Sequence, residues 1–224
     1  MSDLKLMEIQ ADVLFKHDSS SRLTAVNEEG GGEAPFLFLG QTKEGRILRF
    51  NASVPEPVCR EIKDIVQSYP MNSALAKIIG AVSENNSVSN LWMGPAYTFP
   101  ESFQKSSHAV VITEENQEIL RQDFPHLIEE FRPRQPIFAM VEEGRAVSVC
   151  FSARNSDLAA EAGVETLPGY QGKGYAVNCA GAWGMEIRKE KRIPLYSTSW
   201  DNLPSQKIAA KLRLHQYGVD LHVT

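Results

Sequence analysis

The sequence of 224 residues predicts a mixed α/β fold, and two features of its second half carry the prediction. The first feature is the order of the expected elements: strand, helix, two strands, strand, helix, strand, helix, strand. The second is a glycine-rich turn, Gly169-Tyr170-Gln171-Gly172-Lys173-Gly174, between an apolar strand and a helix. Glycines let the main chain approach a ligand closely, and the first amides of a helix have no partners within it. The turn is therefore suited to hold an anion.

The first ninety residues predict a smaller mixed α/β unit. Its expected strands cover residues 11–15, 22–26, 36–40 and 46–50, and its expected helices cover 55–68 and 73–82. The last two strands flank Lys43-Glu44-Gly45, a sequence typical of a hairpin turn. The segment 83–90 is rich in Ser and Asn and marks the expected boundary. We therefore predict one unit of unknown role over residues 1–90 and a second over 91–224.

The second unit has clearer periodicity. Its expected strands cover residues 109–112, 137–141, 146–152, 158–167, 193–200 and 219–223. Its expected helices cover 115–131, with a break near Pro125, 172–191 and 202–214. Glu142-Glu143-Gly144 separates two strands that are expected to pair as an antiparallel hairpin. Apolar residues in the helix after the glycine-rich turn recur at helical spacing, as in Cys179, Trp183 and Ile187.

Composition excludes several classes of protein. The net charge is −5, from 28 acidic and 23 basic residues, which gives no basic surface for nucleic acid. No apolar run has the length of a membrane span and the first residues do not resemble a signal peptide, so we expect a cytoplasmic protein. The three cysteines are expected to be reduced thiols of the core, and the five scattered histidines show no metal-ligand spacing.

Two common phosphate-binding motifs do not fit the glycine-rich turn. A P-loop requires Ser or Thr after Gly-Lys, whereas Gly172-Lys173 is followed by Gly174. A dinucleotide fingerprint requires glycine or alanine three residues later, where Val177 stands.

The motif that does fit is Gln171-x-x-Gly174-x-Ala176, which resembles the signature of the GNAT superfamily of acyl-CoA-dependent N-acyltransferases. The lead-in Thr166-Leu167-Pro168-Gly169-Tyr170 and the later Asp201-Asn202-x-x-Ser205 also resemble that family. The resemblance covers roughly residues 97–224. It implies a GNAT-like acyltransferase fold with a smaller N-terminal α/β extension. It further implies that the fourth and fifth strands of the second unit separate to admit the pantetheine arm of acetyl-CoA.

The same resemblance implies acetyl-CoA as co-substrate, with no metal. Amides around residues 164–166 would bond the pantetheine, and those of residues 172–177 would bond the pyrophosphate. The residues placed at the cofactor are Val164, Thr166, Gln171, Gly172, Lys173, Gly174, Tyr175, Ala176, Val177, Asn202 and Ser205. Asn202 also suits a plain helix cap. Gly163, in the strand, marks either a bulge or close packing.

An amine acceptor is protonated at neutral pH, so its acetylation requires a base. Glu161 and Glu165 lie on the strand beside the expected cofactor and share one face unless Gly163 is a bulge. Each can act as the base, or simply pair with a cation. Members of the family often carry a tyrosine on the later helix that protonates the departing thiolate, and this chain has Ala209 at that position.

These features predict an N-acetyltransferase that transfers an acetyl group from acetyl-CoA to an amine, by direct attack. Neither Cys150 nor Cys179 has an evident activating partner for a covalent intermediate. The N-terminal unit is expected to form part of the acceptor pocket or a homodimer contact. The missing tyrosine favours an alternative, a non-catalytic acyl-CoA-binding or regulatory module. A nucleotide-binding protein that uses the same turn is a further alternative.

Overall fold

The computed structural model describes residues 1–84, 87–101 and 108–224. The helices are α1 (Asp3–Leu14), α2 (Glu56–Ser68), α3 (Met71–Ser83), α4 (His126–Glu129), α5 (Tyr175–Lys189) and α6 (Leu203–Lys211), with 3-10 turns at Gln117–Leu120 and Pro168–Tyr170. The strands are β1 (Phe15–His17), β2 (Leu23–Val26), β3 (Leu37–Gln41), β4 (Arg46–Phe50), β5 (Leu91–Thr98), β6 (Val110–Ile112), β7 (Ile137–Glu142), β8 (Arg145–Asn155), β9 (Ala159–Thr166), β10 (Ile193–Ser197) and β11 (His215–Val223). Among the described helices, none combines the length and apolar character of a membrane span.

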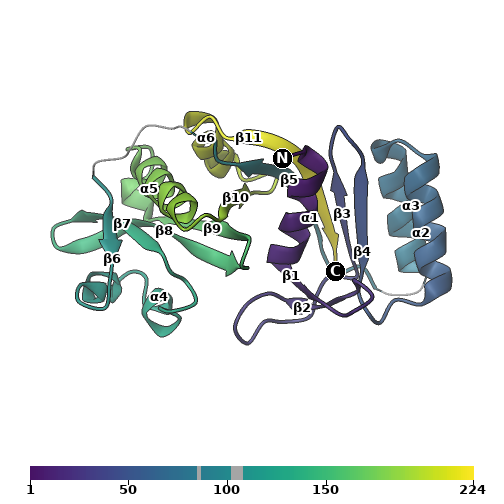
Figure 1. Ribbon diagram of the computed structural model, residues 1–224, viewed down its shortest axis with the longest axis horizontal. Coiled ribbons are helices and arrows are strands. Elements are labelled where there is room, and N and C mark those ends of the chain that lie inside the picture. Colours follow the sequence, from purple (N-terminus) through teal and green to yellow (C-terminus); the bar gives the residue numbers. More distant parts are fainter. Residues whose placement is uncertain (85–86, 102–107) are drawn as a thin grey trace.

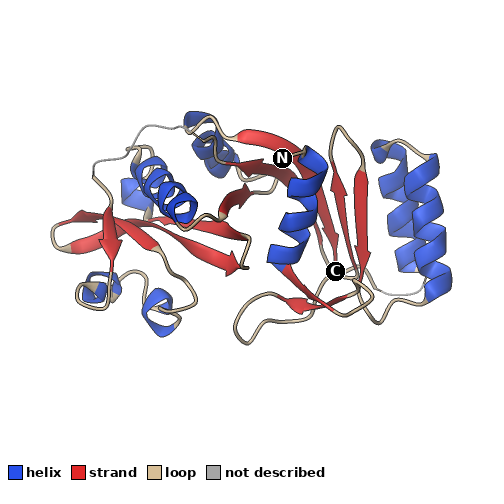
Figure 2. Cartoon of the chain, in the orientation of Figure 1, coloured by secondary structure: helices blue, strands red, loops and turns tan. Residues whose placement is uncertain are grey.

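One large mixed sheet organises the molecule and confirms the predicted fold class. Its nine strands run in the order β4-β3-β11-β5-β10-β9-β8-β7-β6, and β1 and β2 form a separate pair. Within the large sheet β9 and β10 are parallel and the other neighbours are antiparallel. Figure 2 shows helices on both sides of these strands.

The two faces of the sheet carry different helices. Along β9, Ala159 packs in the cluster under α1 and the next residue, Ala160, packs in the cluster under α5. Figure 1 shows α5 on one side of β7, β8 and β9, and α4 on the other side. The helices α2 and α3 pack on β3 and β4 at the far end of the sheet. The buried residues of α5 include Cys179, Trp183 and Ile187, as their spacing predicts.

The large sheet crosses the boundary predicted near residue 90. Strand β3 pairs with β11 from Leu37↔Val223 to Gln41↔Val219, so the first and last parts of the chain share one hydrogen-bonded ladder. Glu28 adds a cross-link, because its carboxylate lies 2.7 Å from the Arg154 guanidinium. The division into two units at this point stays a prediction.

Three elements differ from the prediction. Residues 11–14 end α1 instead of forming a strand; the Ser2 hydroxyl caps this helix by accepting the Lys5 amide at 3.2 Å. Residues 115–131 contain less helix than expected: a 3-10 turn and the four residues of α4 stand on either side of Pro125, where the break was predicted, because proline cannot continue a preceding helix.

Strand β5 was not predicted, because glycine and proline are poor strand formers. A side chain at Gly94 would meet the Thr198 carbonyl oxygen at 1.8 Å, so close contact with the segment after β10 requires glycine. This tertiary contact overrides the local preference.

Candidate active site

The glycine-rich turn ends as a row of free main-chain donors. Gly172 and Gly174 have φ angles of 79° and 84°, in the left-handed region that favours glycine, and α5 begins at the next residue. Within the described ranges, no hydrogen bond engages the amides of residues 172–177. The first bond of the new helix joins the Asn178 amide to the Gly174 carbonyl, at 3.1 Å. The free amides and the positive end of the α5 dipole form a site for an anion.

Strands β9 and β10 separate next to this turn. Their parallel ladder holds three pairs and ends at Leu195↔Glu161. Beyond that pair β9 stays with β8 as far as Thr166↔Ser148, while β10 stays with β5 as far as Ser197↔Ala96. This is the opening that the sequence resemblance implies for the fourth and fifth strands.

The opening exposes main-chain groups of β9. The Leu167 amide donates to the Val147 carbonyl of β8 at 3.0 Å. In an antiparallel ladder, every second residue of a strand bonds its partner strand, and the main-chain groups of the residues between point to the other side. The amides of Val164 and Thr166 consequently point away from β8, toward the side that β10 has left.

A groove runs from this opening past the first turn of α5 to α6, and we call it the α5–α6 groove. Its cavity volume is about 650 Å³. The lining residues are Val164, Glu165, Thr166, Tyr170, Gln171, Gly172, Gly174, Tyr175, Ala176, Val177, Tyr196, Asn202, Pro204, Ser205, Lys207, Ile208 and Lys211.

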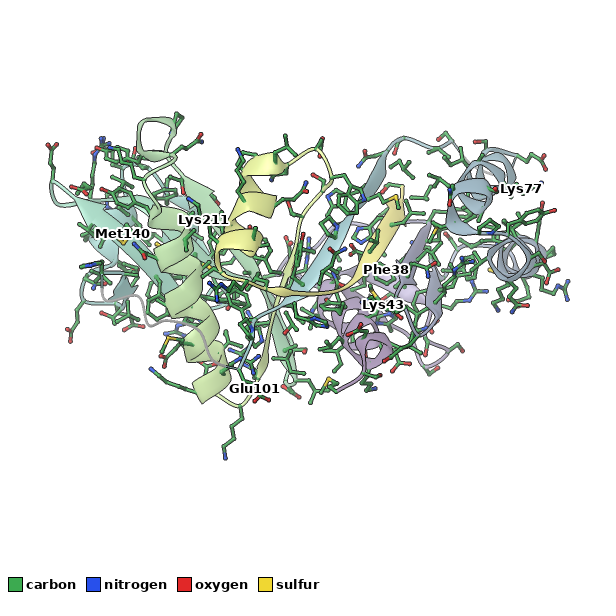
Figure 3. The ribbon with its side chains drawn as sticks, turned by 90° about the horizontal axis from the view of Figure 1, so that it is seen from above. Phe38, Lys43, Lys77, Glu101, Met140 and Lys211 are labelled. Carbon is green, nitrogen blue, oxygen red and sulfur yellow. The ribbon has the colours of Figure 1, made fainter. Side chains whose placement is uncertain are left out.

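Ten of the eleven residues predicted to contact a cofactor lie in this lining. The eleventh, Lys173, places its ammonium 4.7 Å from the centre of the Tyr170 ring. The prediction missed Lys207 and Lys211, although their i, i+4 spacing puts both on one face of α6. Figure 3 labels Lys211 where α6 comes close to α5.

Glu161 lies where β9 and β10 part, and it is 3% exposed. The Ser197 hydroxyl donates to its Oε1 at 2.7 Å, while its Oε2 has no partner among the described residues. Burial raises the pKa of Glu161 to about 7, and the charge of Asp220 adds to this rise. The hydrogen bond from Ser197 and the charge of Arg154 act in the opposite direction.

Glu165 has a different environment, because its side chain is 43% exposed and pairs with His126 of α4. The Glu165 Oε1 and His126 Nε2 atoms lie 3.1 Å apart. The imidazole also meets the ring of Phe151 edge-on, with centroids 6.3 Å apart. The sequence analysis missed His126, because only the tertiary fold brings this histidine to a residue 39 positions away.

Gly163 is a position of close packing and not a bulge. It pairs with Phe151, and a Cβ atom at this glycine would lie 2.6 Å from the Phe151 ring. The register shift between these strands lies on β8, between Ser152 and Arg154. Glu161 and Glu165 therefore share one face of β9, the face opposite α5.

Comparison with known proteins identifies the family of this chain. The model of the family described as GNAT acetyltransferase matches residues 101–218, about half of the chain. The chain belongs to the GNAT acetyltransferase family. No curated protein matches it.

Two solved structures share the GNAT fold with this chain. A putative GNAT-family acetyltransferase from Novosphingobium aromaticivorans is 15% identical with a TM-score of 0.51; the alignment covers 61% of this chain and 65% of the other. A GCN5-related N-acetyltransferase-like protein from Streptococcus suis is 17% identical, again with a TM-score of 0.51, and covers 85% of both chains. At such identities the similarity shows the fold alone.

Three further features of this GNAT chain concern α6 and its contact with β10. The Asn202 Oδ1 accepts the Ser205 amide at 3.1 Å, so Asn202 caps α6 at the edge of the groove. Ala209, at the position of the tyrosine often found in the GNAT family, is 1% exposed and packs in the core. The Tyr196 hydroxyl bonds Ser205, and burial raises the pKa of Tyr196 well above its usual range.

The cysteines are poorly placed to act as nucleophiles. Cys59, Cys150 and Cys179 are free and buried, as the sequence predicts. Burial raises the pKa of Cys179 to about 12 and that of Cys150 well above its ordinary value, so neither forms a thiolate near neutral pH.

Proposed function

We propose that this protein transfers the acetyl group of acetyl-CoA to the amine of a small molecule. The observation that carries the proposal is the row of unbonded amides at residues 172–177, at the mouth of a groove between two separated strands. Membership of the GNAT acetyltransferase family supports acetyl transfer as the reaction.

The residues of the groove suit the parts of acetyl-CoA. The amides of residues 172–177 would bond the pyrophosphate oxygens, and the amides of Val164 and Thr166 would bond the pantetheine. The cations Lys207 and Lys211 line the same groove and offset phosphate charge. Lys173 lies on the adjacent turn and would add a further, solvent-screened contact.

The proposed reaction is a direct displacement. The amine nitrogen attacks the thioester carbonyl carbon, the carbon–sulfur bond breaks with its electron pair on sulfur, and one amine proton passes to a base. The carboxylates available on β9 are Glu161 and Glu165, on the face opposite α5. A thiolate is a good leaving group because a thiol pKa of about 8.5 is close to neutrality, so Ala209 is compatible with turnover.

Calorimetry with acetyl-CoA and a thiol-release assay over a panel of amines test this function. We expect micromolar binding of acetyl-CoA, no comparable binding of ATP, and thiol release with at least one amine. Absence of acetyl-CoA binding would refute the cofactor assignment, and stronger binding of ATP would favour a nucleotide-binding protein.

A second candidate is a non-catalytic acyl-CoA-binding module, which one observation favours. Buried Ala209 supplies no acid on α6 for the departing thiolate. Acetyl-CoA binding without thiol release over the whole panel of amines would favour this module over the enzyme.

A further inference from the structure

We propose that His126, oriented by Glu165, is the general base that takes the proton of the acceptor amine. This inference rests on the proposed N-acetyltransferase function and names a residue for its proton transfer. It also changes the role of Glu165 from base to orienting carboxylate.

The geometry of the pair fits a base held by a second group. The 3.1 Å contact occupies Nε2 of the imidazole, and Nδ1 has no hydrogen-bond partner among the described residues. When the Nε2–H group donates its hydrogen bond to the carboxylate, the neutral imidazole carries a free lone pair on Nδ1. The side chains are 46% and 43% exposed, so an acceptor can reach the pair from solvent.

The pair also lies beside the proposed position of the thioester. Glu165 lines the α5–α6 groove and stands between Val164 and Thr166, whose amides face the opening between β9 and β10. Figure 1 shows α4, the helix that carries His126, on the side of β9 opposite α5. Among the described residues, β9 has no strand partner on its second side beyond Glu161.

Glu161 is less suited to receive the proton. It is 3% exposed, its Oε1 already accepts from Ser197, and its strand neighbour Ala159 packs in the core under α1. An amine cannot contact this carboxylate without displacing packed residues. We therefore assign Glu161 a structural role, at the point where the strands part.

In the proposed step, the acceptor attacks as the neutral amine: its lone pair forms the bond to the carbonyl carbon, and Nδ1 of His126 accepts one of its two protons. The carbon–sulfur bond breaks and its electron pair leaves with sulfur. The imidazolium, stabilised by the Glu165 carboxylate, then returns the proton to the thiolate or to solvent. The step consumes no oxidant, reductant or metal.

The test measures kcat, KM for acetyl-CoA and acetyl-CoA affinity in four variants: His126→Ala, Glu165→Gln, His215→Ala and Glu161→Gln. A panel of alkylamines, polyamines and amino sugars is first screened with wild type, and the amine that it acetylates fastest is used throughout. We expect His126→Ala to lower kcat about 100-fold and Glu165→Gln about 10-fold. Acetyl-CoA affinity should stay within about two-fold. Added imidazole should raise the kcat of His126→Ala at least about ten-fold, an effect that a purely structural role of His126 does not produce.

His215 provides the matched control. Its Nε2 lies 2.8 Å from Asp3 Oδ1 and its side chain is 54% exposed, so His215→Ala removes a similar surface pair away from the groove. We expect its kcat to stay within about three-fold of wild type.

A folded His126→Ala variant with wild-type kcat, or a loss that imidazole does not restore, overturns the assignment of His126. A Glu161→Gln variant that loses activity while His126→Ala keeps it places the base at Glu161 instead. Wild-type protein that releases no thiol with any amine refutes the proposed function itself, and the base with it, which is a different result from an active His126→Ala variant.

Discussion

Gly174 shows how a single residue can fix the position of a ligand. It stands immediately before α5 with φ at 84°, and a side chain there would meet no other atom within 4 Å. Glycine is therefore required here by the backbone conformation and not by a lack of space for a side chain. A left-handed residue at this point turns the following amides toward the groove.

We expect Gly174→Ala to lower the free energy of unfolding by about 1 kcal/mol, because an alanine is strained at this φ angle. The same change should weaken CoA binding at least ten-fold, since the strained turn moves the donor amides. Gly169→Ala is the control: Gly169 also has open space around it, but its φ is not in the left-handed region. Equal CoA affinities for the two variants, by calorimetry, would contradict this explanation.

Glu161 carries a dependence of stability on pH. Its pKa is raised to about 7 by burial, so the folded protein holds this proton more tightly than the unfolded chain. The contribution of Glu161 to stability is consequently largest at acidic pH, falls as the pH rises from the usual glutamate range to about 7, and is constant above it.

Glu161→Gln removes this titration. We expect the free energy of unfolding of the variant minus that of wild type to increase between pH 5 and pH 8, by up to about 3 kcal/mol, because only the wild type loses stability over this range. Urea unfolding at both pH values measures the difference. A difference that does not change with pH would show that Glu161 is ionised in the folded protein at both values.

At the scale of elements, the groove depends on how α5 and α6 begin. The α5 helix begins after Gly174, which has no side chain to cap it, and its first amides have no hydrogen-bond partner in the described part of the chain. The α6 helix begins with a side-chain cap from Asn202. The first helix end is left open for a ligand, and the second is closed and fixes the opposite wall of the groove.

We expect Asn202→Ala to lower the free energy of unfolding by about 1 kcal/mol, because the Ser205 amide loses its acceptor. Acetyl-CoA affinity should fall as the wall of the groove loosens. Asn202→Ser keeps a capping oxygen and should retain most of the stability. If calorimetry shows that the serine variant binds acetyl-CoA as weakly as the alanine variant, the asparagine contacts the cofactor directly.

At the scale of the whole molecule, the first ninety residues complete the sheet that holds the site. Strand β3 pairs with β11, and α1 packs in the same core cluster as Ala159 and Leu195 of β9 and β10. The separation of β9 and β10 begins directly after this packed region. The N-terminal part thus supports one side of the opening, even though no predicted cofactor residue lies in it.

We expect a fragment of residues 91–224 to lack cooperative unfolding, because it exposes one edge of β11 and the apolar surface under α1 and α2. Thermal unfolding followed by circular dichroism, compared with the full chain, makes the measurement. A fragment with a sharp transition and full acetyl-CoA affinity would instead support two separate units with the boundary near residue 90.

Local patterns in the sequence determined the two hairpins, helices α2, α3 and α5, and the glycine-rich turn, because spacing, turn residues and glycine at special φ angles act over a few residues. The family resemblance rested on the same turn, on its lead-in at residues 166–170 and on Asp201-Asn202-x-x-Ser205. Strand β5 was not predictable in this way, since only the close contact with the Thr198 carbonyl requires glycine at position 94.

The tertiary structure alone decided which distant groups meet. In the folded protein Glu161 is buried under α1, His126 lies within hydrogen-bond distance of Glu165, and β3 pairs with β11. Each of these contacts joins residues that are far apart in the chain. A phosphate-binding turn is a local property of backbone dihedrals and can be recognised from adjacent residues. The position of a base depends on side chains from separate elements, and only the packed sheet brings those together.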